Sequence, residues 1–110
     1  MKEERIKLGV VGVDSGQLLI SDPCYIDSQW QNEEFDEKKV KSNFSYNACC
    51  KKTLKENGGQ LNFQLGHPGV GVVFSSGFGD GVYEVYATVK DYGNQGGKRI
   101  SKVEIILIED

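Results

Sequence analysis

The stretch VYEVYATV at Val82–Val89 decides the fold class of this chain. Successive side chains of a β-strand point to opposite faces, so a strand of this composition has two faces of different character. Tyr83 and Tyr86 are an odd number of positions apart and therefore lie on opposite faces. We expect one tyrosine in the core and the other on the surface, and the segment indicates a strand of a β-rich domain.

Five further strands are predicted by the same alternation, or by short apolar runs that turn residues bound. They are Ile6–Val13, Gln17–Ser21, Gln60–Leu65, Gly69–Phe74 and Arg99–Glu109. Asp14-Ser15-Gly16 has the composition of a tight hairpin connection, which would pair the first two strands. The residues expected in the core are Leu61, Phe63, Leu65, Val72, Phe74, Val85, Val103, Ile105 and Leu107.

One helix is predicted between the two halves. Ser45 is a favourable N-cap for a helix over about residues 46–56, and Asn57-Gly58-Gly59 is a strong stop because glycine adopts left-handed conformations without steric cost. The preceding residues, about 27–45, form a polar surface excursion with few apolar anchors, which we expect to be the least stable part. The fold class expected is α+β and β-dominated: a small, mostly antiparallel barrel or two-layer sandwich of about six strands with one inserted helix, in a single domain over residues 1–110.

Composition narrows the class of protein. The chain has 110 residues, 14 glycines and a net charge of −3, so a general nucleic-acid binder, which carries a basic excess, is not expected. It has no apolar run of membrane-spanning length and no signal-peptide core at its start. We therefore expect a cytoplasmic protein that does not associate with a membrane. The three cysteines are expected to be reduced. A homo-oligomer is a further possibility left open.

Two motifs are similar to a known family. They are Asp14-Ser15-Gly16, followed by an apolar run and Ser21-Asp22-Pro23-Cys24-Tyr25, and Gly77-Phe78-Gly79-Asp80-Gly81-Val82-Tyr83-Glu84-Val85-Tyr86. Together they resemble an uncharacterised family of small β-rich proteins of Gram-positive bacteria and their phages. The resemblance covers about Gly9 to Leu107, apart from the polar excursion. It implies a β-rich fold and the importance of Asp22, Cys24, Tyr25, Asp80 and Tyr83, and it implies no established activity.

Two catalytic interpretations start from the bend at Asp22-Pro23. In the first, Cys24 is the nucleophile of a thiol hydrolase and His67 its base, because a thiolate needs a neighbouring base and an exposed position. The alternative is structural: Cys24 is a small apolar plug and His67 caps a strand end. In the second, Asp14, Asp22, Asp80 and Asp91 gather with His67 around a hard metal ion. No metal-ligand spacing supports this, and neither a catalytic residue nor a cofactor is assigned.

The leading hypothesis is a non-catalytic module that binds a small anionic, nucleotide-like ligand. A glycine-rich loop precedes Lys98 and Arg99, and backbone N–H groups beside two cations suit a phosphate. The residues assigned to the ligand are Lys98, Arg99, Asn94, Tyr92, Ser75, Ser76, Phe78, Asp80, Tyr25 and His67. In a phage, such a protein could act as a sponge that sequesters a nucleotide immune signal. The alternative is a protein-interaction or inhibitor domain that uses residues 30–44 as its contact surface.

Overall fold

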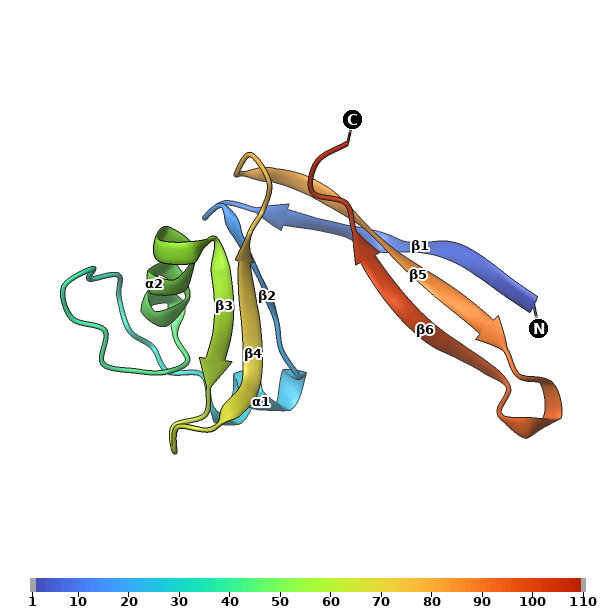
Figure 1. Ribbon diagram of the computed structural model, residues 1–110, viewed down its shortest axis with the longest axis horizontal. Coiled ribbons are helices and arrows are strands. Elements are labelled where there is room, and N and C mark those ends of the chain that lie inside the picture. Colours follow the sequence, from blue (N-terminus) through green and yellow to red (C-terminus); the bar gives the residue numbers. More distant parts are fainter. Residues whose placement is uncertain (1, 110) are drawn as a thin grey trace. The chain divides into compact units, whose positions relative to one another are not determined.

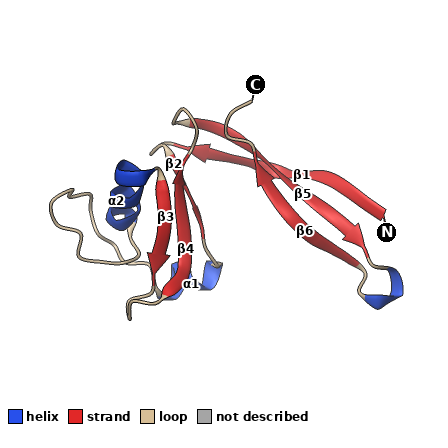
Figure 2. Cartoon of the chain, viewed as in Figure 1, coloured by secondary structure: helices blue, strands red, loops and turns tan. Residues whose placement is uncertain are grey.

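The computed structural model describes residues 2–109, which form two compact units. One unit combines the residues up to Ser15 with those from Gly77 onward, and the other comprises Gly16–Ser76. Each unit contains one three-stranded antiparallel sheet, and each sheet is open (Figures 1 and 2). Six antiparallel strands in the described chain confirm the β-dominated fold class, whereas the barrel alternative is wrong because neither sheet closes on itself.

The first unit is a sheet of three long strands in the order β1-β5-β6. The strands are β1 (Lys2–Val13), β5 (Gly81–Asp91) and β6 (Lys98–Ile105), and a 3₁₀ turn, η1 (Gly93–Gln95), lies in the loop between the last two. The register between β1 and β5 shifts between Lys7 and Gly9, and the register between β5 and β6 shifts between Thr88 and Val89. The segment that decides the fold class is thus the central strand of this sheet.

The second unit packs a helix on a sheet of shorter strands in the order β2-β4-β3. Its elements are β2 (Gln17–Ile20), α1 (Pro23–Ser28), α2 (Tyr46–Glu56), β3 (Gly58–Asn62) and β4 (Pro68–Ser75). Its buried core consists of Phe44, Ala48, Cys49, Leu61, Val70 and Val73. This unit therefore has a core between a helix and a sheet, which is the usual way for such elements to bury an apolar face.

Local signals explain the bounds of α2. The Ser45 side chain accepts a hydrogen bond from the backbone N–H of Ala48 at 3.0 Å, as expected of an N-cap. At the other end, Asn57 is left-handed with φ of 64° and Gly58 has φ of 143°. The helix consequently begins and ends where the sequence indicates.

The expected hairpin between the first two strands is wrong. β1 pairs with β5, and β2 pairs with β4, so the two strands belong to different sheets. β1 has twelve residues and β5 has eleven, so the two match in length, whereas β2 has only four. Asp14–Gly16 is therefore a connection between sheets.

Three of the residues expected in the core are exposed. Leu65 is 93% exposed because β3 already ends at Asn62, and the chain turns back with a hydrogen bond from Gly66 N–H to the carbonyl of Phe63. Val72 is 43% exposed on β4, and Val103 is 54% exposed on β6. Leu61 is buried as expected. The alternation was correct for Leu61 in β3, but it was wrong in β4, where Val73 is 1% exposed and its neighbour Val72 is exposed, and it does not show where a strand stops or whether anything covers its apolar face.

Candidate functional site

The ten residues predicted to bind an anion do not form a single site, although Ser75, Ser76, Phe78 and Asp80 lie in one stretch from the end of β4 to the start of β5. In the first unit, Tyr92, Asn94, Lys98 and Arg99 lie in or beside the loop between β5 and β6. Phe78 and Asp80 precede β5 and so lie at its other end, and a strand of eleven residues is about 35 Å long. These two groups therefore cannot share one small ligand.

The predicted residues of the second unit are also divided. His67 immediately precedes β4 and, with Tyr25, packs around the ring of Phe63, whereas Ser75 and Ser76 lie at the other end of β4. A strand of eight residues is about 26 Å long. Tyr25 and His67 are brought together by the fold, and the two serines are not part of that group.

The glycine-rich loop between β5 and β6 uses its donors internally. Gly93 N–H donates to the Asp91 carboxylate at 2.8 Å, and Gly97 N–H donates to the carbonyl of Gly93 at 2.9 Å. Arg99 Nε donates to the carbonyl of Gly96 at 2.8 Å. An anion-binding nest needs N–H groups that point at the ligand, and here these donors close the turn instead.

Cys24 occupies a helix N-terminus that was not predicted. Asp22 is the N-cap of α1, and its carboxylate accepts a hydrogen bond from Cys24 N–H at 2.9 Å. Pro23 at the first helical position was a signal for this helix, because proline is favoured there. Cys24 is exposed, so the interpretation of a buried plug is wrong.

The surroundings of Cys24 do not activate its thiol. The hydrogen bond with Asp22 raises the pKa of Cys24 above its ordinary value, and the negative charge of Asp22 acts in the same direction. A catalytic cysteine needs the opposite shift, toward the thiolate. His67 stacks on Phe63, with 4.5 Å between ring centroids and 19° between planes. Within residues 2–109, no three His, Cys, Asp or Glu side chains are grouped as metal ligands would be.

The polar excursion is tied to α2 by a hydrogen-bond network around Glu33. The Glu33 carboxylate accepts from the Ser42 hydroxyl at 2.6 Å, from Lys41 N–H at 2.7 Å and from the Ser45 hydroxyl at 3.1 Å. These bonds, chiefly that from Ser42, lower the pKa of Glu33 to about 2. Buried Asn47 accepts from the backbone N–H of Asp36 and donates to the backbone carbonyl of residue 39. These contacts give the excursion an integral place in the second unit.

A shallow groove of about 180 Å³ lies between α2, β3 and residues 40–43. Lys51 and Lys52 line it together with the side chains of Asn43, Gln60 and Asn62. None of the described residues that line it carries a carboxylate, although the protein as a whole is acidic. The groove is a cationic surface that the sequence analysis did not identify, because its lysines occupy an ordinary exposed helix face.

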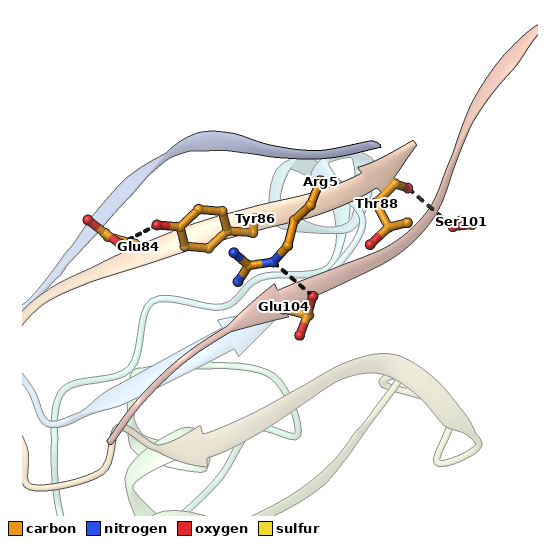
Figure 3. A network of polar contacts seen from close by, with 6 residues as sticks. All are labelled: Arg5, Glu84, Tyr86, Thr88, Ser101 and Glu104. Carbon is orange, nitrogen blue, oxygen red and sulfur yellow. Dashed lines mark hydrogen bonds and ion pairs between the residues drawn. The ribbon is translucent and has the colours of Figure 1, made fainter. Parts of the chain in front are cut away.

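One face of the sheet β1-β5-β6 carries polar and charged side chains that interact with one another (Figure 3). Tyr86 is flanked in register by Lys7 and Glu104. The Arg5 guanidinium lies 3.8 Å from the centre of the Tyr86 ring, and Arg5 Nε lies 3.4 Å from a Glu104 oxygen. Tyr86 donates a hydrogen bond to Glu84, which lowers the pKa of Glu84. The polar side chains of this face are thus exposed to solvent and have partners for their charges and hydrogen bonds.

The opposite face of the same sheet is apolar. Residues that pair directly across antiparallel strands share a face, so the register defines its members. They include Ile6, Val11, Val13, Tyr83, Val85, Ala87, Val89, Ile100, Val103 and Ile105. Ile100 and Val103 are 56% and 54% exposed. The described part of this unit contains three strands and a 3₁₀ turn but no α-helix to cover this face.

The comparisons with known proteins give the family and no function. Among residues 2–109, no helix is long and apolar enough to cross a membrane. Neither the curated proteins nor the solved structures contain a match to this chain. One family model matches residues 1–95. The chain belongs to the family described as Protein of unknown function (DUF4241).

Proposed function

We propose that the protein is a non-catalytic interaction module that binds a polypeptide through the apolar face of the sheet β1-β5-β6. The observation that carries this proposal is the contrast between the two faces of one sheet. One face holds the ordered network of Arg5, Glu84, Tyr86 and Glu104, and the other presents aliphatic side chains that include Ile100 and Val103. If water covered both sides of the sheet, a difference between a polar and an apolar face would not stabilise it.

The energetics of the sheet favour an occupant. A three-stranded sheet with a hydrophobic face meets the usual minimum for independent stability, and covering that face adds to it. Burying an aliphatic side chain completely stabilises a protein by about 1.5–3 kcal/mol, so Ile100 and Val103, which are about half exposed, each stand to gain roughly 1 kcal/mol. A polypeptide that covers this face supplies that gain.

The dimensions of the face suit a polypeptide better than a small molecule. Three strands about 4.8 Å apart and up to about 35 Å long make a face on the order of 500 Å². Ile100 and Val103 form the exposed apolar part of this face, and exposed apolar patches on soluble proteins can mark interaction sites. The face thus replaces residues 30–44, which pack on the second unit, as the contact surface of the interaction hypothesis.

The small anionic, nucleotide-like ligand stays a prediction, and so does a phage protein that sequesters an immune signal. The groove lined by Lys51 and Lys52 suits an anion better than the loop before Lys98 and Arg99, whose N–H donors are occupied. Its volume of about 180 Å³ lies below the range of about 300–1,000 Å³ typical of clefts for drug-sized ligands. It would accommodate a phosphoryl or carboxylate group better than a whole nucleotide.

A photo-crosslinking side chain distinguishes the two faces of the sheet. Val103 and Val10 are 54% and 58% exposed, and the register places them on the apolar and the polar face respectively. We expect a benzophenone amino acid at position 103, in the protein expressed in cells, to form an adduct with one polypeptide, and the same probe at position 10 to form none.

Mass spectrometry of the crosslinked peptides identifies the polypeptide, and its purified form must bind the wild-type protein but not a Val103→Lys variant. Equal labelling from positions 103 and 10 would contradict the proposal. A probe at position 103 that crosslinks only within its own polypeptide chain would contradict it as well.

A further inference from the structure

We infer that the polypeptide covering the apolar face is a second copy of this chain, packed face to face about a two-fold axis. This inference rests on the proposed function, and it names the partner of the same surface. Four observations support it: the relief of the face, its charges, its area and the character of the sheet edges.

The relief of the face is self-complementary. A depression of about 630 Å³ is lined by the apolar Ile6 and Val89 and by five charged residues, Lys2, Glu3, Glu4, Asp91 and Lys98, and the exposed Ile100 and Val103 lie on β6 beside it. Val89 is paired with Ile100, and Ala87 is paired with both Ile6 and Val103, so the depression and these exposed side chains lie at the same level along the strands. A two-fold axis parallel to the strands places β6 of one copy over β1 of the other. Val103 of each copy then lies opposite Ile6 of its partner, and Ile100 lies opposite the row of Glu4 and Val89, in the same way on both copies, as an isologous interface requires.

The charges at this end of the face balance one another. Lys2, Asp91 and Lys98 form one row across the three strands, and Glu4 lies in the next row on this face. Two ammonium groups and two carboxylates therefore border the apolar side chains, and Glu3 adds a carboxylate at the edge of the depression. With the two-fold axis parallel to the strands, Lys2 of one copy faces Lys98 of the other and Asp91 faces Asp91, and each Asp91 lies between the two lysines of the other copy, which reach it diagonally with their long side chains. A strongly basic or acidic partner would find no matching excess.

The area and the twist also fit a second copy. Two faces on the order of 500 Å² each bury about 1,000 Å² in total, which is about the minimum for a specific interface. Sheets that pack face to face keep their strand directions within about 30° of each other because each is twisted. Two copies of one sheet have the same twist, so they meet this condition without rearrangement.

The edges of the sheet disfavour pairing side by side. The outer strands β1 and β6 carry Lys2, Glu3, Arg5 and Lys7 on one side and Lys98, Arg99 and Lys102 on the other. Charged edge residues, lysine above all, and bulges are the features by which proteins prevent edge-to-edge association. Each outer strand also takes part in a register shift. For this sheet, association of copies through the face is therefore favoured over association through an edge.

Sedimentation equilibrium over a concentration series tests the inference, with matched valine variants. We expect the wild-type protein to move from the monomer mass to twice that mass as concentration rises. Val103→Lys should weaken this association at least tenfold, because a buried ammonium replaces an apolar contact. Val10→Lys makes the same chemical change at a similarly exposed valine on the polar face, and it should leave the association unchanged.

A second pair of variants keeps the inference testable if the introduced lysine disrupts the fold of the sheet. Val103→Thr keeps the β-branched shape and should still weaken association, whereas Val10→Thr should not. A wild-type protein that is monomeric at every concentration up to about 1 mM, where apolar interfaces of this size would associate, would overturn the inference. So would equal weakening by both members of a pair.

These results are separable from the proposed function. If the wild-type chain is monomeric but the probe at position 103 crosslinks to a different, identified protein that Val103→Lys no longer binds, the interaction module stands and the second copy does not. If the probe labels no polypeptide either, both fail.

Discussion

Replacing Gly58 with alanine should destabilise the second unit by about 2–6 kcal/mol, the sum of about 1–3 kcal/mol of backbone strain and about 1–3 kcal/mol of overpacking. Gly58 has φ of 143°, a conformation that residues with a side chain rarely adopt. A Cβ atom at this position would lie 2.4 Å from the carbonyl oxygen of Val73 and 2.8 Å from Cα of Phe74. Both atoms belong to the backbone of the central strand β4, which cannot move aside without breaking the sheet.

Gly66→Ala is the control for this prediction. Gly66 also has a positive φ, of 104°, but a Cβ atom there would meet nothing within 4 Å. It should therefore show the conformational cost without the clash. Urea denaturation followed by the fluorescence of Trp30, the only tryptophan, measures both variants. Equal destabilisation by the two substitutions would mean that the close approach of Gly58 to β4 is not what makes glycine necessary.

Phe44→Ala should cost about 3–5 kcal/mol of unfolding free energy, the usual range for removing a buried aromatic side chain. Phe44 is fully buried in the core of the second unit, and the ring of Trp30 meets it edge-on with 4.9 Å between centroids. Its carbonyl also accepts a hydrogen bond from Gln31 N–H at 2.8 Å, so Phe44 holds the start of the polar excursion in place.

Phe35→Ala is the matched change, because Phe35 lies in the same excursion but is 50% exposed. It should cost less than about 1 kcal/mol. Far-ultraviolet circular dichroism during thermal unfolding is the suitable probe, since the fluorescence of Trp30 depends directly on Phe44. A similar loss in both variants would show that the excursion is not anchored through Phe44.

Local determinants made much of the fold predictable. The alternation over Val82–Val89 predicted β5 and its two unlike faces, and Ser45 with Asn57-Gly58 predicted the ends of α2. These elements depend on residues that are neighbours in the chain. The pairing of β1 with β5 is of another kind, because it joins residues 68 to 89 positions apart, and Asp14–Gly16 was therefore misinterpreted as a hairpin.

The predicted ligand site depends in the same way on residues that are far apart in the chain. Asp80 lies in a loop with the composition of a ligand site and Lys98 directly follows another, but the length of β5 between the two loops separates them. The sequence also could not show that the glycine-rich loop satisfies its own N–H groups, since the bond from Gly93 to Asp91 depends on the turn geometry. The apolar alternation also predicted Val103 as core, but Val103 is 54% exposed, because alternation contains no information about whether anything covers a face.

The most direct measurement of the central claim is the solvent exposure of valine methyl groups by NMR, with a soluble paramagnetic agent added. Val103 lies on the apolar face and Val10 on the polar face of the same sheet, and the two are similarly exposed in the single chain. In concentrated protein we expect the agent to relax the Val10 methyls strongly and the Val103 methyls weakly, and we expect dilution to expose Val103. Equal relaxation of the two valines at every concentration would contradict the claim that the apolar face binds a second copy of the chain.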